Sequence, residues 1–509
     1  MNLDHNIEGI DDNLNIIQPE TPENEVKLTF QEAAFAKYEI DPNPPSFEQI
    51  NGIISHDKVL SAIISECKAL DFNTLAKLQE GQTVTRKQLQ IIVVEQILTI
   101  AKERKLSLCK KDGSIYAFNA AYWQQLEKEV MEHFLGVAAE KLGVDEFISK
   151  HYTFKQELFK QFLSSAFLNE AEEKVNGVKV NLLNGTFVIT PDSQYLTSFD
   201  RKDFLTHQLP FSYDEYADCP QFDKYLERVL PDKEQQKVIA EYLGYVFISQ
   251  KVLKLEKALI LLGSGANGKS VFFDIINALF GEENVSNYSL AALTNKEGYQ
   301  RAKLSDKLLN YASEISPNMD STIFKQLVSG EPVEARLPHR DPFLLKDYAK
   351  FIFNTNNLPR DVEQNEAFYR RFLIGKFNVL IPEDERDPKL AQKIIANDLP
   401  GVFNWVIEGL NRVLKQEGFS HSTSMNNAVL EYRQQSDTVF IYLDDVGFII
   451  GEDEKKDLEH FYNYYNDYCK SSGYRPCSKK TLAQRLRSLG FNVYRLSSGY
   501  GVKYSKIKV

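Results

Sequence analysis

The sequence contains few cysteines and no long hydrophobic segment. Its 509 residues include 5 cysteines, an odd number, and no two of them form a C-x-x-C pair. This scarcity argues against a disulfide-stabilised scaffold and a cysteine-based zinc site, and it is typical of a reducing compartment. No apolar run approaches the roughly 18 residues that a membrane-spanning helix requires, and no basic region followed by an apolar core opens the chain. The composition therefore predicts an unexported, soluble protein in the cytoplasm of a host cell.

The sequence also lacks an overall excess of positive charge. Asp and Glu number 71 against 60 Lys and Arg, so the formal net charge is -11. Nucleic acid would therefore not be attracted to the whole surface. The charge is uneven, because Asp4 to Glu25 contains seven acids and no Lys or Arg, whereas Arg475 to Val509 contains nine Lys or Arg and no acid. Any contact with DNA is expected to be local.

Hydrophobic periodicity divides the chain into four parts. Residues 1–45 are acidic and lack apolar periodicity, which predicts a largely disordered tail. Residues 46–232 contain helical patterns and two short hairpin signals, so we expect a mainly helical domain there. Residues 233–420 alternate short apolar strands with helices, which indicates a sheet covered on both faces. A basic domain is expected at 437–509, and the predicted fold class is α/β.

Short apolar or alternating runs predict the strands. One hairpin is expected at Cys109 to Phe118, and another at Val178 to Ile189 around the Asn184-Gly185 dipeptide, which favours a tight turn. The strands expected in the third part are Ala258–Leu262, Lys307–Ala312, Pro332–Leu337, Phe351–Thr355 and Phe372–Phe377.

A glycine-rich loop follows the first strand of the third part. Its sequence fits G-x-x-x-x-G-K-[ST] and lies between a predicted strand and a predicted helix over Val271 to Phe280. The loop amides would hold the phosphates of ATP, Lys269 would reach the β- and γ-phosphates, and Ser270 would ligate Mg²⁺. An ordinary glycine turn is the alternative, which the flanking elements disfavour. The predicted ATP-binding residues are Gly263, Ser264, Gly265, Ala266, Asn267, Gly268, Lys269, Ser270 and Val271.

Two later strands end in polar residues that would complete a site for ATP hydrolysis. Ser313 and Glu314 follow one of them, and Glu314 would activate the attacking water and share Mg²⁺ with Ser270. Asn356 follows the next strand and would hydrogen-bond the γ-phosphate and the water, with Asn357 as the alternative. A solvated strand-end charge and a simple turn are the competing interpretations.

Two consecutive arginines follow shortly afterwards. Arg370 and Arg371 would stabilise transition-state charge, and their place in the chain suggests that they reach the nucleotide of a neighbouring subunit as arginine fingers. Which of the two does so stays open, and a surface pair is the alternative.

The order of these motifs resembles superfamily 3 helicases, specifically the phage and plasmid primase-helicase family that includes the poxvirus primase-helicase. The resemblance covers about Asn181 to Phe419 and is weaker over Asp457 to Phe491. It implies an AAA+-like P-loop module that assembles as a hexameric ring and moves along single-stranded DNA in the 3′-to-5′ direction. Besides the glycine loop, it is carried by Leu183-Asn184-Gly185, Ser329-Gly330-Glu331, Ala335-Arg336 and Phe368-Tyr369-Arg370-Arg371-Phe372. Glu331 stands where the family more often has Asp.

The resemblance also implies a hairpin that projects into the pore of the ring. Here that segment is Glu334 to Pro342, with His339 and Arg340 at its tip, where they would contact DNA phosphates. A plain exposed basic hairpin is the alternative. No convincing cluster of metal-binding carboxylates suggests a primase active site, so a primase would be a separate partner. The DNA-contacting residues expected here are Arg336, His339, Arg340 and Lys346, with Lys350 on the return strand.

The basic C-terminal part has the pattern of a winged helix. A helical stripe at Leu458 to Tyr468 is followed by a helix at Lys479 to Leu489 and a hairpin at Phe491 to Tyr504. The aromatic stripe of the first helix is expected to be core. A protein-docking surface is the alternative for the basic face. The expected phosphate contacts are Lys479, Lys480, Arg485 and Arg487, with Arg495 on the wing.

Together these features predict an ATP- and Mg²⁺-dependent, hexameric DNA helicase. It would serve the replication of a phage, plasmid or other mobile element and act on single-stranded and forked DNA. One alternative is an origin-binding replication initiator or AAA+ switch in which ATP drives assembly. Another is an AAA+ remodeller of protein complexes, whose activity would depend on a protein rather than on DNA.

Overall fold

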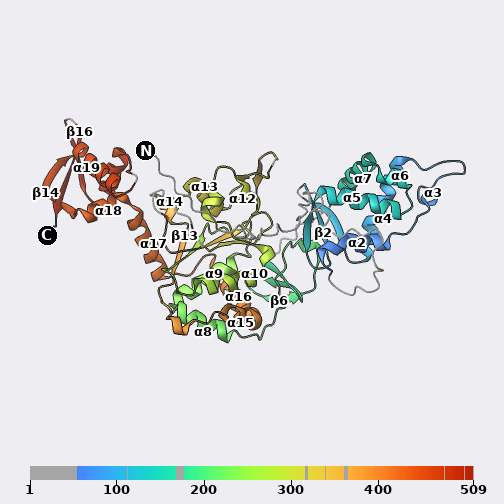
Figure 1. Ribbon diagram of the computed structural model, residues 1–509, viewed down its shortest axis with the longest axis horizontal. Coiled ribbons are helices and arrows are strands. Elements are labelled where there is room, and N and C mark those ends of the chain that lie inside the picture. The colour runs from blue at the N-terminus through green and yellow to red at the C-terminus, as the bar shows by residue number, and fades with distance from the viewer. Residues whose placement is uncertain are drawn as a thin grey trace, which may run out of the picture. The chain divides into compact units, whose positions relative to one another are not determined.

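The computed structural model describes residues 54–111, 113–167, 177–313, 315, 319–338, 340–359, 365–474, 476–497 and 499–507 (Figure 1). The expected acidic tail, 1–45, lies outside the described residues. The described chain forms two compact units, one from residues 54–117 and 125–167 and the other from residues 118–124 and 177–507. Within the described residues, no helix has both the length and the apolar character needed to cross a bilayer.

The first unit is mainly helical, as expected. Its longest helix, α4, begins with a capping box in which Thr85 and Gln88 satisfy each other's backbone amides. The apolar side chains of α4 at helical spacing, including Val93, Ile97 and Ile100, are buried in the core. The elements here are α2 (His56–Glu66), α3 (Phe72–Leu75), α4 (Arg86–Glu103), β1 (Ser107–Lys111), β2 (Ser114–Phe118), β3 (Trp123–Leu126), α5 (Lys128–Lys141), α6 (Glu146–Lys150) and α7 (Tyr152–Ser165).

The second unit begins with the sheet of β4 (Val178–Leu182), β5 (Gly185–Ile189) and β6 (Gln194–Thr197). Leu182 pairs with Gly185, so Leu183 and Asn184 form the turn, one residue earlier than the Asn184-Gly185 dipeptide suggested. The Asn184 side chain closes this turn by bonding to both the N–H and the C=O of Tyr213. The third strand was not expected.

The expected boundary at residue 232 does not coincide with the structural one. Apolar residues from Val178 to Leu230 share one continuous core with residues 238–413. The described residues from Val178 to Leu230 therefore pack with the central sheet. Periodicity detects elements but not the core they join, which is why the sequence placed the boundary too late.

A five-stranded parallel sheet forms the centre of the second unit, in the order β13-β7-β12-β9-β8. The prediction of an α/β protein with a parallel sheet is confirmed. Along β7, Leu259 and Leu261 enter the core on one face, and Ala258 and Ile260 enter the core on the other. The strands are β7 (Ala258–Leu262), β8 (Val285–Ser286), β9 (Leu309–Ala312), β12 (Lys350–Thr355) and β13 (Phe372–Lys376).

Helices cover both faces of this sheet (Figure 1). The helices α9 and α16 approach closely at Gly244 and Gly409, where an added Cβ would lie within 2.6 Å and 2.3 Å of the opposing backbone. The main helices are α8 (Pro220–Val229), α9 (Lys233–Tyr245), α10 (Lys269–Phe280), α13 (Ser321–Ser329), α15 (Leu390–Asn397), α16 (Leu399–Gln416) and α17 (Thr423–Ser436), and the short ones are α11 (Leu290–Thr294), α12 (Tyr299–Ala302) and α14 (Glu366–Tyr369).

The strand expected at Pro332–Leu337 does not join the central sheet. It forms β10 (Val333–Ala335), which pairs in antiparallel fashion with β11 (Phe343–Leu345). A hairpin therefore spans the segment for which the resemblance implied one. His339, which was expected at the tip, lies outside the described residues.

The C-terminal part contains the expected helix, helix and hairpin in that order. Two further elements, α18 and β14, were not expected, and β14 was missed because its residues Glu452 to Asp457 are all charged and do not alternate with apolar ones. Phe461 and Tyr465 of the aromatic stripe are buried in the core of this part. The elements are α18 (Thr438–Asp445), β14 (Phe448–Asp457), α19 (Leu458–Ser471), α20 (Lys479–Ser488), β15 (Asn492–Leu496) and β16 (Gly499–Lys506).

Lys350 is not on the hairpin surface, as the sequence suggested, but buried at the start of β12. Its ammonium lies 4.4 Å from the centre of the Tyr245 ring, a favourable cation–π contact. Burial nevertheless lowers the pKa of Lys350 to about 8, although the nearby Asp347 opposes this shift. The lysine therefore cannot contact DNA, and its buried charge destabilises the fold.

We predict that Lys350→Met stabilises the protein at neutral pH. Between the folded pKa and the unfolded value near 10.4, the unfolded chain holds more protons, so the stability of the wild type rises with pH. The stabilisation, about 1–3 kcal/mol at pH 7, should therefore shrink toward pH 10. Thermal unfolding at pH 7, 8.5 and 10 measures this, with the exposed Lys346→Met as control. A difference in stability between Lys350→Met and the wild type that does not change with pH would contradict the prediction.

Candidate functional site

The glycine loop between β7 and α10 is held in one shape by its own backbone. The N–H of Gly263 donates to the C=O of Thr355 at 3.1 Å, which ties the loop to β12. Gly265, Ala266 and Gly268 have φ angles of 108°, 50° and 86°, all in the left-handed region. The helix α10 begins at Lys269, two residues earlier than the sequence suggested.

Two glycines of the loop have no room for a side chain. A Cβ on Gly263 would lie 2.1 Å from Asn267 Nδ2 and 2.5 Å from the carbonyl oxygen of Phe377. A Cβ on Gly268 would lie 2.6 Å from a methyl carbon of Val229 in α8. Loop, β13 end and α8 are therefore packed against one another.

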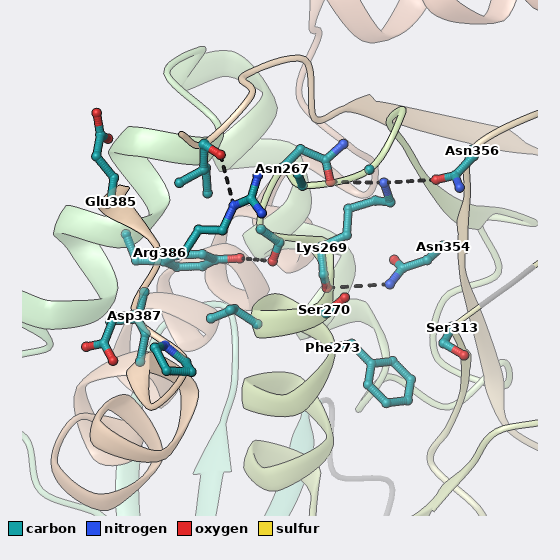
Figure 2. A pocket seen from close by; sticks show the side chains of 18 of the residues that line it. Asn267, Lys269, Ser270, Phe273, Ser313, Asn354, Asn356, Glu385, Arg386 and Asp387 are labelled. Atoms are coloured by element: carbon teal, nitrogen blue, oxygen red, sulfur yellow. Dashed lines mark hydrogen bonds between the residues drawn. The ribbon is translucent and has the colours of Figure 1, made fainter. Parts of the chain in front are cut away.

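Lys269 is the centre of the site (Figure 2). Its ammonium donates to the carbonyl oxygen of Gly263 at 2.7 Å, to Asn267 Oδ1 at 3.0 Å and to Asn356 Oδ1 at 3.4 Å. Burial lowers the pKa of Lys269. Three neutral oxygens thus surround a partly buried cation, and an anionic oxygen at this place would be a stronger acceptor.

The sheet order brings the predicted polar residues to one edge. β12 lies between β7 and β9, and Thr355 pairs with Leu262, so Asn356 emerges beside the glycine loop. β12 separates β9 from β7, but β9 ends at the same edge, where Ser313 lines the cavity. Glu314 lies outside the described residues.

A buried hydrogen-bond relay supports this edge, and no sequence motif predicts it. Tyr311 of β9 donates its hydroxyl to Asn354 Oδ1 at 2.9 Å, and Asn354 Nδ2 faces the carbonyl oxygen of Lys269 at 3.5 Å. Burial raises the pKa of Tyr311 well above its usual value, so the hydroxyl remains protonated. The relay thereby joins β9 and β12 to the first residue of α10.

The loop forms one wall of a cavity of about 690 Å³, a size suited to a small ligand. The opposite wall is the strap, which we define as residues 381–390 between β13 and α15. Ile381 donates its N–H to the carbonyl oxygen of Ala266 at 2.9 Å, and Tyr225 of α8 donates its hydroxyl to the carbonyl oxygen of Gly268 at 2.9 Å. Sequence reasoning missed the strap and Tyr225, because no motif or periodicity marks residues that only the tertiary path brings to the loop.

The cavity fits a phosphate-bearing ligand better than a resident metal. The loop residues Gly265 to Ser270 line the cavity, with two glycines among them and with Lys269 at its centre. Ser270 also lines the cavity and is the first side chain positioned to meet a phosphate-bound cation. Among the residues that the structure describes, no three His, Cys, Asp or Glu side chains gather into a metal site.

The two consecutive arginines have different surroundings. The guanidinium of Arg371 is 9% exposed and donates to Ser329 Oγ at 2.7 Å and to the carbonyl oxygen of Ala367. Arg370 is 57% exposed and pairs with Glu256 at 3.0 Å. Neither lines the cavity of its own chain. Of the two, Arg370 is the one accessible to another molecule.

Three of the residues predicted to contact DNA are accessible near the hairpin. Arg336, Arg340 and Lys346 are exposed on or beside the β10–β11 hairpin, where Arg336 Nε donates to the carbonyl oxygen of Arg340 at 3.2 Å.

The basic helix α20 carries the second group of predicted DNA contacts. Lys480 is exposed, whereas Lys479 pairs with Glu459. Arg485 pairs with Asp437 at 2.7 Å and is mostly buried, and the guanidinium of Arg487 lies 5.3 Å from the Tyr500 ring centre. Intramolecular partners thus occupy part of the basic face.

Known sequences match two stretches of the chain. A family described as D5 N terminal like matches residues 95–231, and a family of unknown function, DUF5906, matches residues 261–371. The first match ends just after α8 and the second begins in β7, so Tyr225 and Gly268, which are hydrogen-bonded, come from the two stretches. The expected relation to the primase-helicase family is supported at this level.

A protein of Acanthamoeba polyphaga mimivirus, named "Putative helicase", is 21% identical to the chain over 253 residues. The match covers 43% of this chain and 25% of the viral protein, so the chain corresponds to about a quarter of that relative's length. Among solved structures, two ligand-free structures of the NrS-1 C-terminal region are similar, with TM-scores of 0.45 and 0.42 at 13% identity. They cover 81% and 80% of this chain, which covers 98% of each of them.

We predict that Gly263→Ala disrupts the loop. The new methyl group would meet the carbonyl oxygen of Phe377 and displace Asn267 and Lys269, at a cost of about 1–3 kcal/mol in stability. Thermal unfolding measures this. Gly418→Ala is the matched control, because its Cβ would meet only the carbonyl oxygen of Gln416, at 3.8 Å. Equal unfolding temperatures for both variants would show that the loop is not packed as described.

Proposed function

We propose that the protein is an ATP- and Mg²⁺-dependent DNA helicase of superfamily 3 that acts in the replication of a phage, plasmid or other mobile element. The observation that carries the proposal is the position of Lys269, whose ammonium joins the glycine loop to Asn356 at the end of the adjacent strand. A D5 N terminal like segment and a similarity to a viral protein named as a helicase support the same conclusion.

In this proposal the loop amides and Lys269 bind the phosphate chain of ATP. The phosphate oxygens take over the hydrogen bonds that Lys269 now makes with Gly263, Asn267 and Asn356. Asn356, released from Lys269, orients the γ-phosphate and the attacking water, and Glu314 accepts a proton from that water. Bound Mg²⁺, held by Ser270 and Glu314, would neutralise phosphate charge.

We further propose that the subunits form a hexameric ring, which translocates 3′-to-5′ on single-stranded DNA. Arg370 would act as the finger toward the neighbouring nucleotide, since it is exposed, and Arg371 would brace its segment through Ser329. The β10–β11 hairpin, with Arg336, Arg340 and Lys346, would contact the DNA phosphates. Lys480 and Arg487 of α20 would add contacts, and a separate primase would supply primers.

Lys269→Ala should abolish ATP hydrolysis and strand separation. The variant removes the cation at the centre of the loop, so we expect at least a 100-fold loss of steady-state ATPase rate. The measurement is ATP hydrolysis together with displacement of a labelled strand from a forked duplex, with each tail polarity offered separately. The matched control is Lys415→Ala, an exposed lysine in the last turn of α16, which should behave as the wild type.

Normal turnover in Lys269→Ala would refute the site. ATPase without unwinding, combined with a sequence-selective footprint on DNA that does not require hydrolysis, would favour an origin-binding initiator or AAA+ switch. ATPase that responds to a protein and not to DNA would favour a remodeller. Unwinding from the opposite tail would reverse the proposed polarity and leave the active site intact.

The two neighbouring asparagines provide a sharper test. Asn356 lines the large cavity and accepts from Lys269, whereas Asn357 does not line that cavity. Both residues line a second cavity of about 290 Å³. We expect Asn356→Ala to lower the ATPase rate roughly 100-fold and to retain nucleotide affinity, and Asn357→Ala to stay within a few-fold of the wild type. Single-turnover hydrolysis with a parallel binding titration separates the two effects. The reverse ranking would transfer the role to Asn357.

A further inference from the structure

The strap carries a cation that the proposed function has not used. Arg386 lines the large cavity, and Figure 2 shows its side chain directed toward the glycine loop. Its Nε donates to the carbonyl oxygen of Ile381 at 3.1 Å, and the N–H of Ile381 donates to the carbonyl oxygen of Ala266. Two consecutive hydrogen bonds therefore connect the guanidinium to the loop.

The charge of Arg386 is not neutralised by the carboxylates on either side of it. Glu385 pairs with Arg228 of α8 at 2.6 Å. Asp387 accepts from the N–H of Lys389 at 2.9 Å and pairs with Lys393 at 2.6 Å. Hydrogen bonds from Lys393 and Lys389 also lower the pKa of Asp387, which remains ionised and committed to them.

The orientation of the three side chains agrees with this pairing. All three residues line the cavity, but Glu385 and Asp387 point away from the glycine loop, whereas Arg386 points toward it (Figure 2). Arg386 is exposed, and Ile381 holds its Nε. Its two terminal nitrogens have no acceptor in the described part of the chain that would compete with a ligand. They form a planar pair of donors, a geometry that matches two oxygens of a phosphate.

We propose that Arg386 binds the phosphate chain of the nucleotide in its own subunit, from the side opposite Lys269. The inference rests on the proposed function, because it assigns a second cation to the same cavity. Lys269 approaches the phosphates from beneath the loop, and Arg386 approaches from the strap, so the ligand lies between two cations on different walls. Binding would also fasten the strap to the loop, since Ile381 already connects them.

The test is equilibrium binding of ADP and of a non-hydrolysable ATP analogue to the full chain, at low and high salt. Arg386→Ala should lower the affinity for both ligands roughly tenfold at low salt. This loss of affinity should be smaller at high salt because the contact is ionic. Arg386→Lys, which keeps the charge but loses the anchoring Nε, should recover part of the affinity. The unfolding temperature of Arg386→Ala should match that of the wild type.

Arg228→Ala is the matched control. It removes an exposed arginine that holds the same strap through Glu385, but Arg228 does not line the cavity. The nucleotide affinity of Arg228→Ala should stay within twofold of that of the wild type. Unchanged affinity in Arg386→Ala, or an equal loss in Arg228→Ala, would overturn the direct contact, while loss in Lys269→Ala would leave the proposed function standing. Failure of the wild type to bind either nucleotide would instead refute the proposed function.

Discussion

The second unit is organised around a lysine that is partly buried without a carboxylate among its three hydrogen-bond acceptors. Gly263, Asn267 and Asn356 give Lys269 neutral oxygens at 2.7 to 3.4 Å, and burial lowers its pKa. Taking a cation out of water is costly unless strong partners replace the water. A carboxylate here would remove that cost but also the affinity for an anion. The loop, the sheet edge and the strap together maintain this cation ready to bind an anion.

The sequence was sufficient for those features that local patterns determine. The continuous apolar run Ala258–Leu262 predicted β7 and its two buried faces, and the spacing of Gly263, Gly268 and Lys269 predicted the loop between a strand and a helix. It was not sufficient for features that depend on packing. The sheet order that puts β12 between β7 and β9, and the continuous core that joins residues 178–230 to the sheet, arise from contacts distant in sequence.

The same distinction applies to single side chains. From the sequence, Lys350 was expected to be an accessible basic residue of the hairpin region, like Lys346. In the structure the side chain of Lys350 is buried against Tyr245. Arg371 and Arg370 are neighbours, yet Ser329 sequesters the first and leaves the second at the surface. A strand or a tight turn places successive side chains in opposite environments, so the residue type alone does not show which charge is accessible.

Pairing within the chain therefore decides which cations of this acidic protein can meet an anion. Of the basic residues on α20, Arg485 is engaged by Asp437 and Lys479 by Glu459, whereas Lys480 is exposed. On the strap, Glu385 and Asp387 are engaged by other cations, which leaves the charge of Arg386 to the cavity. At physiological salt a charge acts over roughly 8 Å. A net charge of -11 is therefore compatible with strong local attraction for phosphate, since the distant acids are screened and the adjacent ones are already paired.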